Sequence, residues 1–146
     1  MTTKKDKWFT LFYGYFEVAV DLLSGLYILL WTSQFLLAYL PGIQFFGSPQ
    51  NSAVVFMARS FGYMVLLSGL MQFAAINFGN ATTRKYFLVA LCTGDFMLLY
   101  LSGVFFYDFT DWTALIVFNF VFTSFLLSTR LFYLFTGVPE NSRIAK

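Results

Sequence analysis

Four long apolar runs constrain the fold of this chain more than any other feature. They extend over residues 8–40, 53–76, 86–106 and 113–136, and polar or turn-forming segments separate them. At about 1.5 Å per residue, each run is long enough for a helix that crosses the roughly 30 Å hydrocarbon core of a bilayer. We therefore expect an all-α membrane protein whose residues 1–146 form a single transmembrane domain.

The composition excludes most other classes of protein. Hydrophobic residues make up 59% of the chain and charged residues only 11%, whereas a soluble domain carries about 25% charged residues. A soluble domain of 146 residues could not bury so much apolar surface. We expect no nucleic acid as a partner, and membrane lipids instead.

The residue types that most often carry catalysis and metal binding are scarce. The chain has no His, which is the commonest general base and metal ligand. Its single cysteine, Cys92, lies within an apolar run, and we interpret it as a packing residue. The sequence therefore predicts no catalytic residues, no metal site and no cofactor.

Short connections between the runs predict their arrangement. Residues 41–52 contain two prolines and two glycines, residues 77–85 and 107–112 are polar, and Gly137 and Pro139 follow the last run. Four spans with short loops predict an up-down-up-down four-helix bundle. The first run has 33 residues, or roughly 50 Å as a helix. It must either tilt or place its first turns in the membrane interface.

The basic residues predict the orientation. They lie at the N-terminus, in the second connection and in the tail, whereas residues 41–52 hold no Lys or Arg. The positive-inside rule then puts both termini on the cytosolic side. Asn80 begins an Asn-Ala-Thr glycosylation sequence. On this topology it faces the cytosol, and we expect it to be unmodified. The basic residues outside the apolar runs are Lys4, Lys5, Lys7, Arg84, Lys85, Arg143 and Lys146.

A set of charged and polar residues lies inside the apolar runs. A charged side chain at mid-membrane costs about 2.5–3.5 kcal/mol on insertion scales and is a functional hypothesis by default. Glycines at positions 62 and 69 and polar residues at helical spacing give each run a stripe that favours contact between helices. The set consists of Glu17, Asp21, Arg59, Asp95, Asn119 and Arg130.

Depth in the membrane suggests which of these residues meet. Asp95, Arg130 and Glu17 all fall in the cytosolic half, and Asp21 is the nearest candidate partner of Arg59. Two interpretations remain open. Either the ion pairs fix the packing of the helices, or the set forms a site for a proton or a polar ligand. The two arginines could also extend to lipid head groups.

Short elements spread along the chain carry a resemblance to known families. The chain resembles small four-helix membrane proteins of the DoxX-like and EXPERA (emopamil-binding-protein-like) group. The resemblance implies the four-helix architecture and, for the emopamil-binding type, a sterol isomerase; the absence of His departs from what such isomerases are expected to use. The elements are Phe16-Glu17 followed by Gly25, the Gly94-Asp95 pair, and Trp112, Asn119, Thr123, Arg130 and Gly137 near the end.

These observations favour a non-enzymatic accessory or interaction subunit of a larger membrane assembly, such as a respiratory complex. The alternative is a small lipid- or sterol-binding protein or a proton-coupled carrier that uses the charged set. A lipid-modifying isomerase is the third hypothesis, with Asp95 or Glu17 as its acid. The mitochondrial inner membrane and the endomembranes both remain open as locations.

Overall fold

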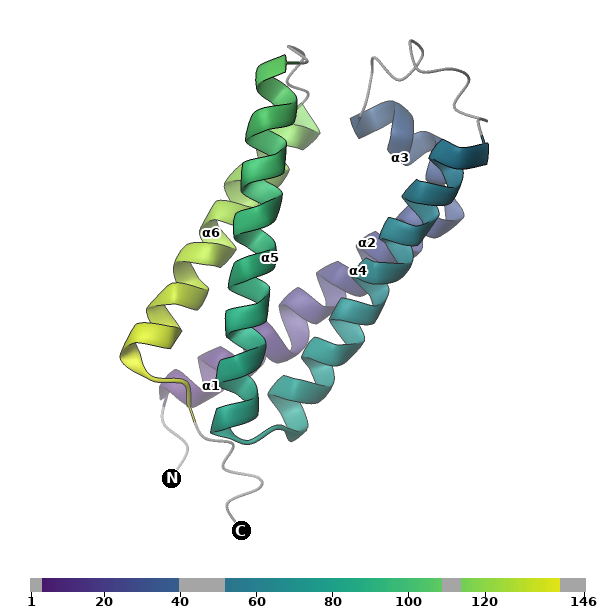
Figure 1. The fold of residues 1–146 in the computed structure, drawn as a ribbon. Helices are drawn as coiled ribbons and strands as arrows, with labels where there is room; N and C mark the ends of the chain where they lie inside the picture. The colour runs from purple at the N-terminus through teal and green to yellow at the C-terminus, as the bar shows by residue number, and fades with distance from the viewer. Residues whose placement is uncertain (1–3, 40–51, 109–113, 140–146) are drawn as a thin grey trace. The chain divides into compact units, whose positions relative to one another are not determined.

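The computed structural model describes residues 4–39, 52–108 and 114–139, and these parts are helical apart from short connections. The all-α prediction is confirmed. The chain divides into two compact units, Met1–Phe78 and Gly79–Lys146. The elements are α1 (Lys4–Leu11), the π-helical turn η1 (Phe12–Phe16), α2 (Glu17–Leu30), α3 (Thr32–Tyr39), α4 (Ser52–Phe78), α5 (Ala81–Asp108) and α6 (Ala114–Thr136) (Figure 1).

Within the described residues, three helical stretches are long and apolar enough to cross a membrane. They are Lys4–Leu30, Ala53–Phe78 and Val117–Thr136. Helix α5 has 28 residues, with Arg84 and Lys85 in its first turns and Asp95 further along. Helices of this length and composition agree with the expected all-α membrane protein. The four-span bundle, the single transmembrane domain and the topology stay predictions. The first predicted connection lies outside the described residues except for Ser52.

The first apolar run is not one helix, because the chain bends at Trp31. This residue has φ −121° and ψ 45°, and α3 leaves it at an angle to α2 (Figure 1). The Thr32 hydroxyl donates to the carbonyl of Ile28 at 2.7 Å and lies 3.2 Å from that of Leu29, so it competes with the backbone for these acceptors. The 33-residue run therefore does not continue as one straight helix past Leu30, and the expected tilt or interfacial first turns stay predictions.

Helix α2 packs closely against α4 because glycines meet at the crossing. A Cβ atom placed on Gly25 would lie 2.6 Å from Cγ of Leu66 and 2.8 Å from the carbonyl oxygen of Gly62. A Cβ atom on Gly69 would lie 3.0 Å from Cβ of Asp21. Small residues let helix backbones approach in lipid. The expectation that the glycine stripe of the second run faces a neighbouring helix is therefore confirmed.

The second unit is a pair of helices, α5 and α6, whose ends are capped by their own sequence. The Asn80 side chain accepts a hydrogen bond from the backbone N–H of Thr83 at 2.8 Å, which is an N-cap. Gly137 follows α6 with φ 90°, a conformation that favours glycine at a helix C-terminus. Helix α5 therefore starts at Ala81 instead of near 86, and Arg84 and Lys85 belong to its first turns rather than to a loop.

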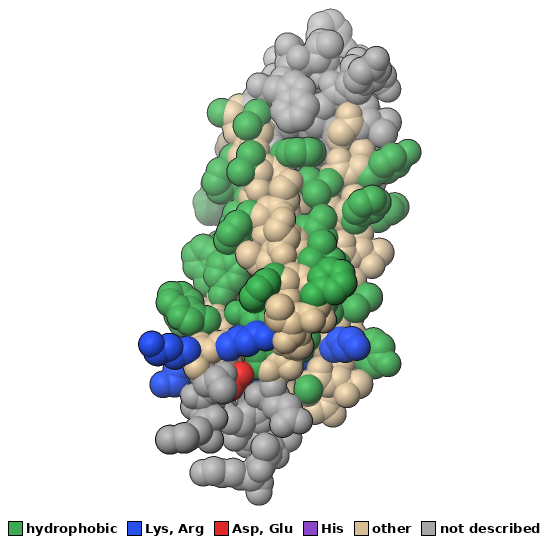
Figure 2. Space-filling view, turned by 90° about the vertical axis from the view of Figure 1, so that its left-hand side faces the viewer, with side chains coloured by type: hydrophobic (Ala, Val, Ile, Leu, Met, Phe, Trp, Pro, Cys, Tyr) green, Lys and Arg blue, Asp and Glu red, His purple; other side chains and the backbone are tan. Residues whose placement is uncertain are grey.

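Buried and exposed residues separate clearly on these two helices. Hydrophobic side chains cover much of the molecular face drawn in Figure 2, and Lys and Arg side chains lie toward one end of that face. The buried positions recur every three or four residues, so they share one face of each helix. They are Arg84, Leu88, Cys92 and Asp95 on α5, and Thr123, Leu126 and Arg130 on α6.

Candidate functional site

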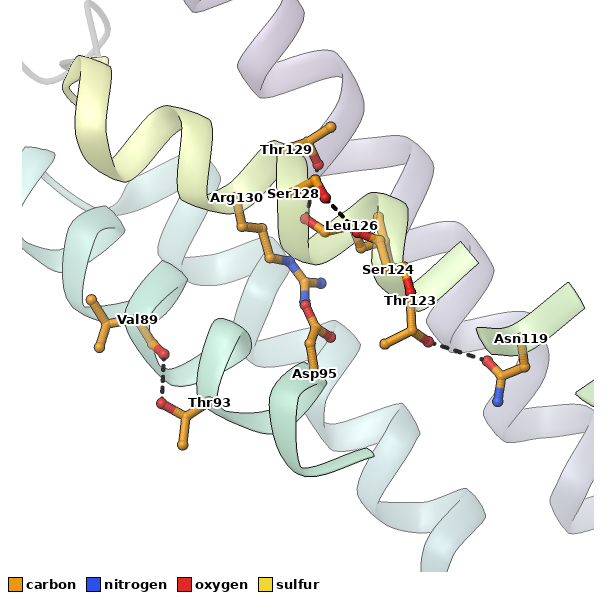
Figure 3. Close-up of polar contacts among 10 residues, drawn as sticks. All are labelled: Val89, Thr93, Asp95, Asn119, Thr123, Ser124, Leu126, Ser128, Thr129 and Arg130. Atoms are coloured by element: carbon orange, nitrogen blue, oxygen red, sulfur yellow. Dashed lines mark hydrogen bonds and ion pairs between the residues drawn. The ribbon is translucent and has the colours of Figure 1, made fainter. Parts of the chain in front are cut away.

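A buried ion pair joins the two helices of the second unit. The Arg130 guanidinium extends from α6 and donates from Nη1 to Oδ2 of Asp95 on α5 (Figure 3). Their side chains are 3% and 9% exposed. Each charge offsets the other where water is scarce, because the electrostatic attraction grows as the local dielectric falls. The expectation that Asp95 and Arg130 meet is confirmed.

The other polar groups of α6 bond along their own helix. The Thr123 hydroxyl lies 3.5 Å from Oδ1 of Asn119 (Figure 3). The Ser124 hydroxyl donates to the carbonyl of Phe120 at 2.8 Å. Asn119 itself is exposed. These contacts satisfy hydroxyl groups within the helix. Asn119 thus contacts a residue one turn away on its own helix, and this contact is separate from the Asp95–Arg130 pair.

Two amide side chains on α4 bind the π-helical turn of the first unit. Nε2 of Gln72 donates to the carbonyl of Tyr13 at 2.9 Å, and Nδ2 of Asn77 donates to the carbonyl of Gly14 at 3.2 Å. A π-helical turn shifts the backbone bonding pattern, and here the N–H of Glu17 bonds to the carbonyl of Phe12. The wide turn therefore presents carbonyls that side chains of a neighbouring helix can reach.

Glu17 lies directly after this turn, and its side chain is 1% exposed. It belongs to the first unit, while Asp95 and Arg130 belong to the second, so a meeting of the three stays a prediction. Gln72 and Asn77 were not predicted as contact residues from the sequence. Their amide groups near the end of an apolar run were the available signal, because a polar group in lipid needs a partner.

Asp21 and Arg59 do not pair, which corrects the expectation for them. Cβ of Asp21 lies opposite Gly69, ten residues from Arg59 on α4 and so roughly 15 Å away along the helix. Arg59 instead donates from Nε to the hydroxyl oxygen of Thr32 at 3.4 Å. Asp21 and Arg59, both expected to belong to one charged cluster, therefore lie apart within the first unit.

Arg84, expected from the sequence to be a loop charge, makes a buried contact within the second unit. Its side chain is 2% exposed, and Nη1 donates to the carbonyl of Pro139 at 3.0 Å. This bond ties the chain just after α6 to the first turn of α5. No sequence signal separated Arg84 from its neighbour Lys85, which is exposed.

Nothing in the described geometry resembles a metal centre, since no three Cys, Asp or Glu side chains in that part of the chain are grouped to hold an ion. No protein-family model, curated protein or solved structure matches the chain. The resemblance to the DoxX-like and EXPERA-like group therefore stays a prediction.

Proposed function

We propose that the chain is a non-enzymatic, multi-pass membrane protein that acts as an accessory subunit of a larger membrane assembly. The observation that carries this proposal is the exposed apolar surface of its helices. Phe135 is 86% exposed, Phe56 71% and Tyr86 70%. Apolar patches on this scale mark contact with a membrane or with other proteins. On membrane-spanning helices they offer surface to acyl chains and to partner helices.

The buried polar contacts support a structural role within each unit. The Asp95–Arg130 pair and the amide bonds of Gln72 and Asn77 each link one helix to another. Interhelical hydrogen bonds and ion pairs hold helices together in lipid, where the hydrophobic effect does not. This use of the polar groups agrees with a subunit that contributes shape and surface rather than chemistry.

The topology proposed for this role has four spans with both termini on the cytosolic side. Helix α5 supplies the fourth span, since its 28 residues extend about 42 Å. Lys4, Lys5, Lys7, Arg84 and Lys85 then share one side. Expression in cells with a glycosylation assay at Asn80 tests it. An unmodified Asn80 is expected, and a glycan there would overturn the orientation.

Co-purification tests the subunit role. A tagged chain extracted from its native membrane in a mild detergent is expected to bring other membrane subunits with it, identified after chemical cross-linking. A tagged multi-pass protein of similar size serves as the control for non-specific capture. Phe125→Ser and Phe132→Ser change exposed positions of α6 and map the contact. A chain that migrates alone under all extraction conditions contradicts the role.

A second candidate is a lipid- or sterol-binding protein or a proton-coupled carrier. Asp21 favours it, because its carboxylate forms no hydrogen bond or ion pair with another residue in the described ranges, although it lies within a membrane-type helix. Vesicles containing the purified protein and a pH-sensitive dye test the coupling. Proton flux above that of empty vesicles is expected to vanish in Asp21→Asn and to persist in Asp6→Asn. Flux equal to that of empty vesicles contradicts this candidate.

A further inference from the structure

The bend at Trp31 places a cationic side chain in a fixed position on the surface of the first unit. Arg59 is exposed on α4, and its Nε bonds to Thr32, the first residue after the bend. The Thr32 hydroxyl is buried and already donates its proton to the carbonyl of Ile28 at 2.7 Å. Its oxygen can therefore only accept from a second partner, which the N–H of Arg59 provides.

This bond leaves the outer edge of the guanidinium to bind another group. A guanidinium carries five N–H donors in a planar fork, and the Nε bond uses only one of them. The two terminal nitrogens form the edge that matches two oxygens of a phosphate. Because Nε is fixed to a residue of the other helix, the fork is positioned before any ligand arrives.

The surroundings of Arg59 are those of a membrane interface. Trp31 is 50% exposed and stacks on Tyr27 with ring centroids 6.0 Å apart. Tyr63, one turn from Arg59 on α4, is 63% exposed, and Phe56 is 71% exposed. Trp and Tyr are typical of the interfacial level of a bilayer. Arg59 lies seven residues, about 10 Å, from the start of α4 at Ser52, within reach of the head groups.

We propose that Arg59, positioned by Thr32 at the Trp31 bend, binds the phosphate of a phospholipid whose acyl chains lie along the neighbouring aromatic side chains. The Arg59 guanidinium binds two oxygens of the phosphate. The exposed apolar side chains contact the acyl chains, so the site prefers the lipid to free phosphate. The inference rests on the proposed membrane embedding. It differs from the subunit role because lipid binding requires no protein partner.

Native mass spectrometry of the purified full chain, with lipid added in detergent, tests this site. Phosphatidylglycerol is the lipid probe, diacylglycerol with the same acyl chains lacks the phosphate, and inorganic phosphate lacks the chains. The wild type is expected to bind phosphatidylglycerol at least tenfold more tightly than either of the other two. Arg59→Gln is expected to weaken phosphatidylglycerol binding about tenfold, which corresponds to the loss of one charge-assisted contact.

Two further variants separate the effect of the position of Arg59 from the effect of its charge. Thr32→Val keeps the Arg59 charge but removes the acceptor of its Nε bond, and a roughly threefold loss of affinity is expected. Lys85→Gln removes an exposed basic residue from α5 and is expected to leave binding unchanged. Helix content measured by circular dichroism identifies any variant that fails to fold, and the remaining variant then carries the test.

Three results would overturn the proposal. They are equal binding of diacylglycerol, inorganic phosphate binding as tightly as phosphatidylglycerol, and an unchanged affinity in folded Arg59→Gln or Thr32→Val. The co-purification experiment is independent of all three. A failure of lipid binding with partners still present removes this site and leaves the subunit role, whereas the reverse result removes the role alone.

Discussion

The two units of the chain hold their helices together in different ways. In the first unit, Gly25 and Gly62 bring the backbones of α2 and α4 into contact, and the amides of Gln72 and Asn77 bond to buried carbonyls of the π-helical turn. In the second unit, the Asp95–Arg130 ion pair joins α5 to α6. In the proposed membrane setting both solutions answer the same problem, because lipid removes the hydrophobic drive that pairs helices in water.

Because of this difference, we expect the two units to respond in opposite ways to added side-chain volume and to loss of charge. A glycine contact depends on volume, so one added methyl group disturbs it while a change of charge elsewhere does not. An ion pair depends on both partners, so removal of one leaves the other charge buried without compensation. The first unit is therefore expected to tolerate loss of charge, and the second to tolerate added volume at Gly94 and Gly103 of α5, where a new Cβ meets nothing within 4 Å.

The largest effect is expected for Arg130→Met. The substitution keeps a long apolar side chain but leaves Asp95 buried without its cation, and we expect a loss of about 3 kcal/mol in unfolding free energy. Unfolding of the purified protein in mixed micelles, followed by circular dichroism, measures it. A change below about 0.5 kcal/mol would mean that the pair does not hold α5 and α6 together.

A double variant sharpens this result. Asp95→Leu combined with Arg130→Met removes both charges and leaves apolar groups of similar size, so stability is expected to recover to near the wild-type value. If the double variant stays as unstable as Arg130→Met alone, the loss comes from altered packing instead of from an uncompensated charge.

The next effect is expected for Gly25→Ala in the first unit. The new Cβ would lie 2.6 Å from Cγ of Leu66 and 2.9 Å from its backbone nitrogen, so α2 and α4 must separate. We expect a loss of about 2 kcal/mol in unfolding free energy, measured in the same micelles. Gly94→Ala is the matched control, because nothing lies within 4 Å of its new Cβ. It is expected to be neutral or stabilising by up to about 1 kcal/mol. Equal losses of unfolding free energy in the two variants would mean that the first unit depends no more on glycine packing than the second.

The sequence predicted the parts of the fold that depend on local pattern. Long apolar runs predicted helices of membrane-crossing length, and the spacing of Gly62 and Gly69 predicted a contact face. Asp95 and Arg130 were expected to meet because an isolated charge in lipid needs a partner. Each of these inferences follows from periodicity or from the cost of burying a charge.

The rest depends on contacts between segments that no local pattern specifies. The bend at Trp31 follows from the Thr32 hydroxyl and from the packing of α3 on α4, in an otherwise continuous apolar run. The π-helical turn becomes stable when Gln72 and Asn77 bond to its carbonyls, 59 and 63 residues away. Arg84 and Lys85 look alike in sequence, yet only Arg84 is buried against Pro139.

A smaller effect is expected for Gln72→Met, which keeps the size of the side chain but removes its donor. The Tyr13 carbonyl loses its amide partner, and side-chain hydrogen bonds in lipid contribute roughly 0.6 kcal/mol on average and up to about 1.7. We expect a loss of about 1 kcal/mol in micelle unfolding. Met71→Leu, at the exposed neighbouring position, is the control and is expected to be neutral. A neutral Gln72→Met would mean that this amide bond adds nothing measurable to the stability of the first unit.

The smallest effect is expected at the N-terminus of α5, where Asn80 caps the helix independently of the ion pair. Asn80→Ala removes the oxygen that accepts the Thr83 N–H and hydroxyl, and we expect a loss of about 0.5–1 kcal/mol. Asn80→Asp keeps an accepting oxygen and abolishes the glycosylation sequence, so it is expected to retain near wild-type stability. Hydrogen exchange at the amides of the first turn measures both variants, because a lost cap exposes those amides first. Equal protection in both variants would show that the cap is not needed where the Arg84–Pro139 bond already fixes this end of the helix.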